Sequence, residues 1–121
     1  MTVAAFAQAG KREITKAQNR QAILDAAREV FGESGFEAVT VRDIIRRTGL
    51  ASGTFYNYFR SKEEVASALS RDGARRFSPV LKAQRERART WEAFVRGAIS
   101  AYYGFLASEH DNWLARRPAE E

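Results

Sequence analysis

The sequence predicts an all-α protein, and three observations support this fold class. Apolar residues recur at three- and four-residue intervals along most of the chain, which is the spacing of a helix face. No segment shows the apolar–polar alternation of a strand. Residues that cap helix N-termini, Thr40, Ser61 and Thr90, stand directly before three of the periodic segments. We therefore expect a bundle of helices without a sheet.

Composition is typical of a globular, soluble protein. The chain has 121 residues, enough for one ordinary domain, and is 45% hydrophobic and 29% charged. No stretch approaches the roughly 18 consecutive apolar residues of a membrane span, and Met1–Gly10 lacks the features of a signal peptide. The absence of cysteine excludes disulfides and fits a reducing compartment. We expect a cytoplasmic protein with no membrane partner.

Positive charge is concentrated in the first half of the chain. The net charge is +5. Residues 1–62 hold ten Lys and Arg against six Asp and Glu, a balance of +4, whereas residues 63–121 hold ten against nine, a balance of +1. An uneven excess of this kind favours an anionic partner for the first half. Charge alone leaves open that the basic surface only aids solubility.

Four elements are expected in the first half. Residues 1–14 lack periodicity and predict a flexible N-terminal arm, followed by a helix over about 16–33. A short helix over about 41–47 should follow Thr40, with Asp43 completing a capping box. A third helix is expected over about 52–58, with Phe55 and Phe59 on its buried face rather than stacked on bases.

The second half predicts two longer helices and a short one. Ser61 begins a helix that should reach about Phe77, where Ser78-Pro79 closes or kinks it. A charged linker over Lys82–Arg89 is expected to follow. The helix after Thr90 is apolar over more than one face and therefore needs neighbours on several sides. A sixth helix is expected over about 112–117.

The feature most informative about function is the pair of short helices joined by a tight turn at Gly49. Ile44, Ile45 and Leu50 can bury the inner side of this pair. The second helix then presents Ser52, Thr54 and Tyr56 outward, and Gly53 adds no side chain that would obstruct close approach. A DNA major groove, about 12 Å wide, admits one such helix. The pair therefore predicts a helix-turn-helix.

The same region resembles the DNA-binding signature of TetR/AcrR-type transcriptional regulators. The resemblance covers about residues 15–77 and is densest in the run FEAVTVRDIIRRTGLASGTFYNYFRSKEE, residues 36–64, with its Gly-Thr-aromatic-Tyr-x-x-Phe-x-Ser-Lys-Glu order. It implies a three-helix DNA-binding head over 15–77 with its motif at 40–59. It also implies that 78–121 is a partial helical domain for effector binding and dimerisation.

The resemblance further implies a role for individual residues. Positions that face bases are Arg42, Ser52, Gly53, Thr54 and Tyr56, and positions that contact phosphates are Thr40, Asn57, Tyr58 and Lys62. One position departs from the family pattern: Ala51 stands where the family usually places a serine that caps the recognition helix, and the hydroxyl lies at the next residue. We therefore expect this helix to begin one residue later.

The function implied is that of a repressor. It would bind a palindromic double-stranded DNA operator as a homodimer, on the nucleoid, and release it when a small apolar effector binds. No cofactor is expected. With no cysteine and one histidine, His110, the usual nucleophile–base pairs and metal sites of enzymes are missing. The alternative is a truncated helical interaction module that associates with another regulator and does not bind DNA alone.

Overall fold

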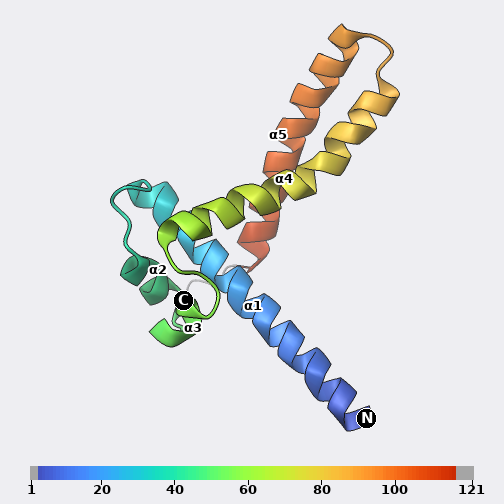
Figure 1. The fold of residues 1–121 in the computed structure, drawn as a ribbon. Coiled ribbons are helices and arrows are strands. Elements are labelled where there is room, and N and C mark those ends of the chain that lie inside the picture. Colours follow the sequence, from blue (N-terminus) through green and yellow to red (C-terminus); the bar gives the residue numbers. More distant parts are fainter. Residues whose placement is uncertain (1–2, 117–121) are drawn as a thin grey trace. The chain divides into compact units, whose positions relative to one another are not determined.

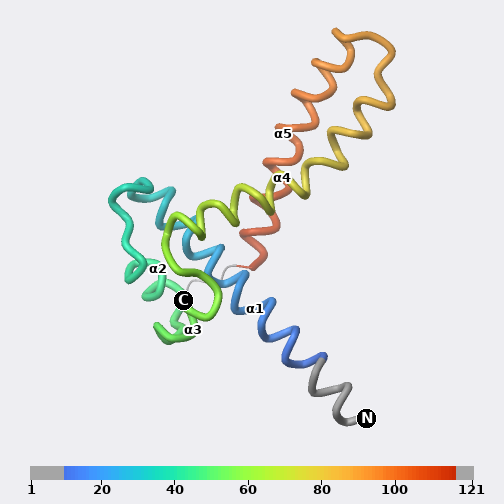
Figure 2. The backbone as a smooth tube through the Cα atoms, viewed as in Figure 1, coloured from blue at the N-terminus to red at the C-terminus, as the bar shows by residue number. Residues whose placement is uncertain are grey.

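The protein consists of helices joined by short connections (Figures 1 and 2). The structure is a computed structural model that describes the backbone of residues 3–116 and the side chains of residues 10–116. Its helices are α1 (Val3–Ser34), α2 (Val41–Thr48), α3 (Ser52–Tyr56), α4 (Lys62–Arg87) and α5 (Trp91–Arg116). No strand occurs in residues 3–116, so the predicted all-α class is confirmed. None of the helices described is long and apolar enough to cross a membrane.

The chain divides into two compact units between Leu69 and Ser70. The first unit contains α1, α2, α3 and the beginning of α4, and the second contains the rest of α4 together with α5. From the sequence, the DNA-binding head was expected to end at about residue 77, which is later than the end of the first unit. The functional limits of the two domains remain predictions.

Helix α1 begins far earlier than the expected start at about residue 16. Residues 3–14, for which a flexible arm was predicted, are helical, while residues 1–2 lie outside the described part. Alanine has the highest helix propensity, and four alanines in residues 4–9 favour continuation of the helix. The pattern of apolar residues did not predict helix at residues 10–14, because the side chains of residues 10–18 are all exposed and the helix needs no apolar face there. The helix ends as expected, with Gly35 in the left-handed region (φ 81°) and its N–H donating to the Phe31 carbonyl at 2.9 Å.

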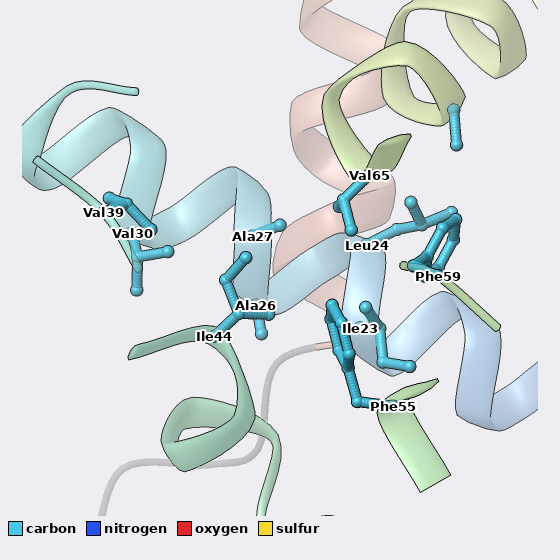
Figure 3. Packing of buried hydrophobic residues seen from close by; sticks show 11 residues of the cluster. Ile23, Leu24, Ala26, Ala27, Val30, Val39, Ile44, Phe55, Phe59 and Val65 are labelled. Carbon is cyan, nitrogen blue, oxygen red and sulfur yellow. The ribbon is translucent and has the colours of Figure 1, made fainter. Parts of the chain in front are cut away.

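The core of the first unit gathers one apolar face from each of its helices. Figure 3 shows side chains from α2, α3 and α4 directed toward α1. The residues buried there are Ile23, Leu24, Ala26, Ala27, Val30, Val39, Ile44, Phe55, Phe59, Val65 and Ala68. Phe55 and Phe59 are 1% and 5% exposed, so the prediction that they belong to the core is confirmed. This core fixes α3 on the scaffold formed by α1 and α2.

Helix α4 passes through Pro79 instead of closing there. A proline inside a helix removes one backbone hydrogen bond. Packing on both sides of Pro79 compensates for this loss and holds the helix together. Before the proline, the Phe77 ring lies 5.5 Å from the Tyr102 ring and 5.2 Å from the Phe105 ring, both on α5. After it, Gly97 lies so close to Gln84 that a Cβ there would collide with the glutamine side chain. The expected linker from residue 82 is therefore helical through Arg87.

Helix α5 is continuous from Trp91 to Arg116, so the expected break before a sixth helix does not occur in the described residues. Thr90 caps α5 as predicted, accepting a hydrogen bond from the Ala93 N–H at 3.1 Å. No glycine or proline interrupts residues 105–117, which explains why the helix continues. Residue 117, the last of the expected sixth helix, lies outside the described part. Helix α5 has no buried residue, although much of its sequence is apolar.

Candidate nucleic-acid interface

The start of α2 is held by a reciprocal capping box. The Asp43 N–H donates to the Thr40 hydroxyl at 3.2 Å, and the Thr40 N–H donates to the Asp43 carboxylate at 2.9 Å. The hydrogen bond from the Thr40 backbone, more than that from its side chain, lowers the pKa of Asp43 below its ordinary value of 3.8. The predicted box is confirmed, and it fixes the direction in which α2 leaves the preceding loop.

The turn between α2 and α3 depends on Gly49 and Thr48. Gly49 adopts a left-handed conformation (φ 73°), which glycine enters without steric penalty, and its N–H donates to the Ile45 carbonyl at 3.2 Å. The Thr48 hydroxyl donates to the same carbonyl at 2.7 Å and accepts a bond from the Leu50 N–H at 3.0 Å. These bonds satisfy the end of α2 and set the direction of α3, as a helix-turn-helix requires.

Helix α3 has one buried face and one open face. Phe55 anchors the helix in the core, whereas Ser52, Gly53 and Tyr56 are exposed, Tyr56 at 57%. Thr54 is half-buried. Of the four α3 positions expected to face bases, three therefore share an accessible surface and Thr54 lies at its edge.

The expected shift in the start of α3 does not occur. The helix begins at Ser52, and Ala51 occupies the N-cap position with extended backbone (φ −71°, ψ 150°) and no side-chain hydrogen bond. The Ala51 carbonyl still accepts the first bonds of the helix, from the N–H groups of Thr54 and Phe55 at 3.0 and 3.3 Å. Because the backbone alone starts the helix, the hydroxyl at Ser52 remains on the exposed first turn.

The other predicted contact residues differ in accessibility. Thr40, Arg42 and Asn57 are exposed, so their side chains are available to a partner. Tyr58 is half-buried and its ring packs against the core of the first unit. Only part of Tyr58 can therefore contact a phosphate, and its ring has a structural role that the sequence did not indicate.

Lys62 has a structural role that sequence reasoning missed. Its ammonium donates to the carbonyls of Phe36 at 2.8 Å and Glu37 at 3.2 Å, and lies 4.5 Å from the centroid of the Phe36 ring. An ammonium has three N–H donors, so two are used in joining the start of α4 to the loop before α2. The predicted phosphate contact of Lys62 would use the third.

Arg47 joins α2 to the end of α1. Its guanidinium forms two hydrogen bonds with the Glu33 carboxylate, at 2.9 and 3.0 Å, and a third with Glu29 at 3.4 Å. The hydrogen bond with Glu33 is the main reason why the pKa of Arg47 is raised. Arg46 and Arg47 are both exposed, but Arg47 also helps to hold α2 in place.

The geometry suits insertion of α3 into a groove. The helix is short, its first turn carries small side chains, and α2 lies beside it on the same scaffold (Figure 1). Exposed Arg42 and Arg46 stand four residues apart on α2 and therefore share a face, which adds positive charge beside α3. Backbone and side-chain groups of this kind can contact base edges and phosphates together.

Comparison with known proteins identifies the same region. The profile of the family described as "Bacterial regulatory proteins, tetR family" matches residues 23–69. The chain is 30% identical over 89 residues to the fatty acid metabolism regulator protein of Bacillus subtilis, an alignment covering 74% of this chain and 46% of that protein.

Two repressors named AcnR are also similar. The one from Corynebacterium efficiens is 40% identical over 100 residues, covering 82% of this chain and 47% of the repressor. The one from Corynebacterium glutamicum is 40% identical over 63 residues, covering 52% of this chain and 34% of the repressor. The chain thus spans less than half the length of these relatives.

Proposed function

Because the chain belongs to the tetR family of bacterial regulatory proteins, we propose that it is a sequence-specific DNA-binding transcriptional repressor whose α3 enters the major groove. The observation that carries this proposal is the open face of α3. Phe55 is buried beneath that face, while Ser52, Gly53 and Tyr56 are exposed on a helix held by a fixed turn. A rigid helix with small, polar outward residues is suited to read base edges.

The proposed roles divide the site into a reading surface and a positioning surface. Arg42, Ser52, Gly53, Thr54 and Tyr56 would face base edges, and Thr40, Asn57, Tyr58 and Lys62 would contact phosphates. Thr54 and Tyr58 can contribute only partly, because both are half-buried. The third N–H of Lys62 would bind a phosphate while the other two keep the loop before α2 in place.

The second unit would supply regulation. Exposed apolar side chains on α5, among them Trp91 at 77% and Tyr103 at 67%, favour association with further helices. We propose that they belong to a surface that pairs two copies and admits a small apolar effector, whose binding releases a palindromic operator. Such a repressor would act on the nucleoid, in the cytoplasm, without catalysis. The alternative, an interaction module that does not bind DNA, is not favoured, because the relatives are named as transcriptional repressors and regulators.

Two neighbouring residues allow a test of this proposal. Preferred sequences are first selected from a randomised duplex library with the wild-type chain. Tyr56→Ala should then lower discrimination between selected and random duplexes by about 1–3 kcal/mol, because a base contact is lost. Asn57→Ala, the matched control on the next exposed residue, should weaken both duplexes alike, because phosphates carry no sequence. The opposite pattern would show that the roles are reversed.

The salt dependence of wild-type binding tests DNA binding itself. If each head contacts about five phosphates, log affinity should fall with log salt at a slope of about −4 to −5 per head. Fluorescence anisotropy of a labelled duplex across a salt series gives this slope. Binding that does not respond to salt, or no binding at all, would contradict the proposed function and favour the interaction module.

A further inference from the structure

The N-terminal part of α1 carries a group of cations, of which Lys11, Arg12 and Lys16 are exposed and Arg20 is half-buried. Lys11, Arg12, Lys16 and Arg20 stand there with Glu13 as the only acidic residue in the range 10–24. Every side chain from residue 10 to residue 18 is exposed, so none of them contributes to the core. Lys11, Arg12 and Lys16 form no ion pair with another side chain in residues 10–116. Folding of the first unit therefore does not explain this positive charge.

Arg20 places one end of this group of cations near the end of α3. Arg12, Lys16 and Arg20 are spaced by four residues, so they form a row on one face of α1 with about 6 Å along the axis between neighbours. The Arg20 guanidinium carbon lies 5.8 Å from the centroid of the Phe59 ring. Phe59 follows α3 closely, and its N–H donates to the Phe55 carbonyl at 3.1 Å. The row thus starts beside the end of α3 and continues outward along α1, whose N-terminal part extends beyond α2 and α3 in Figure 1.

We propose that Arg12 and Lys16 form a second DNA-binding surface, which contacts the phosphates of the duplex whose groove α3 occupies. This inference rests on the proposed function, because it needs a duplex held at α3. A duplex carries one negative charge per about 1.7 Å of its length, so an extended row of cations beside the docked helix meets phosphates whatever the sequence. The surface would therefore add affinity and salt dependence without adding sequence preference.

A pair of double variants with equal charge change tests the proposal on the whole chain. Arg12→Ala/Lys16→Ala removes the surface, and Lys82→Ala/Arg85→Ala removes two exposed cations from α4 in the second unit as the control. Affinity for a labelled random-sequence duplex is measured by anisotropy between 50 and 200 mM KCl. Each lost phosphate contact should reduce the steepness of the log–log plot by about 0.9 and the affinity by about eightfold at 0.1 M salt. Circular dichroism checks that the exposed substitutions leave the melting temperature unchanged.

The proposal is supported if the slope of log affinity against log salt becomes shallower in Arg12→Ala/Lys16→Ala by about 0.9 for each of the two lost contacts, while the control keeps the wild-type slope. Arg12→Lys/Lys16→Arg, which exchanges the cations and keeps the charge, should also keep the wild-type slope. If the wild type binds with salt dependence but both alanine pairs change the slope equally or not at all, the surface is overturned and the proposed function stands. If the wild type does not bind any duplex, the proposed function fails and the surface fails with it.

Discussion

Substitution of alanine at Gly49 and at Gly53 separates effects on protein stability from effects on DNA binding. Both glycines have open space where a Cβ would be added, so neither substitution causes a collision in the unbound protein. Gly49 has φ 73°, whereas Gly53 lies inside α3 and is not among the residues with positive φ. Alanine is disfavoured in the left-handed region and favoured over glycine in a helix. The two variants should therefore change stability in opposite directions.

The magnitudes follow from backbone conformation. Gly49→Ala should lower the free energy of unfolding by about 1–2 kcal/mol, the penalty for an L-residue in the left-handed region. Gly53→Ala should raise it by about 0.5–1 kcal/mol, because alanine restricts the unfolded chain and suits the helix. On the proposed base-facing surface, the added methyl group of Gly53→Ala should nevertheless weaken binding to a selected duplex by about 1–3 kcal/mol, as overpacking does in a close-fitting contact.

Urea unfolding followed by circular dichroism gives the stability of each variant, and anisotropy with a selected duplex gives affinity at a temperature where both are folded. The expected result is a more stable Gly53→Ala that binds more weakly and a less stable Gly49→Ala that binds nearly as the wild type does. Unchanged affinity of Gly53→Ala would refute the placement of Gly53 against the bases. Loss of stability in Gly53→Ala would refute the conformational argument.

Three further predictions concern the ends of α2 and α3. Ala51→Ser should supply the missing side-chain cap of α3 and raise the free energy of unfolding by about 0.5–2 kcal/mol, measured by urea unfolding, and no gain would show that the cap position is already satisfied. Arg47→Ala and Glu33→Ala should each lower stability, with a coupling energy of about 0.5–1 kcal/mol in a double-mutant cycle. Arg47→Ala should keep the wild-type slope of DNA affinity against salt. A slope reduced by about 0.9 would mean that Arg47 contacts a phosphate. Asp43 has a lowered pKa in the folded protein, so its hydrogen bonds to Thr40 stabilise the protein above pH 3.8 and stabilise it less as pH falls through the folded pKa. The difference in stability between the wild type and Asp43→Asn should therefore shrink in that acidic range. A constant difference from pH 7 to pH 2 would contradict this linkage.

Much of the helix-turn-helix could be predicted because its signals are local. Thr40 and Asp43 are three residues apart, and Gly49 follows α2 directly, so the sequence itself contains the groups that start and end that helix. The burial of Phe55 and Phe59 was expected from their four-residue spacing, although Phe59 lies just after the end of α3.

Features that depend on contacts distant in sequence could not be predicted in the same way. Lys62 bonds to carbonyls 25 and 26 residues earlier, and Arg47 pairs with carboxylates 14 and 18 residues earlier. The sequence around Lys62 or Arg47 does not indicate a bonding partner so far away in the chain. Of the two outcomes expected at Pro79, closure of α4 does not occur, because packing against α5 on both sides maintains the helix. Apolar periodicity did not indicate helix at residues 10–14 because the side chains there are all exposed, and an exposed helix needs no apolar period.

The most direct test of α3 as the DNA-reading helix is a nuclear magnetic resonance titration of the ¹⁵N-labelled chain with a selected duplex. Backbone amide signals respond to contacts in their immediate surroundings and can be followed residue by residue. The proposed function predicts that the largest changes fall on the amides of Ser52–Tyr56, with smaller ones at Thr40 and Arg42 and little change in the middle of α5. Changes confined to α4 and α5, with the α3 amides unaffected at saturating duplex, would contradict it.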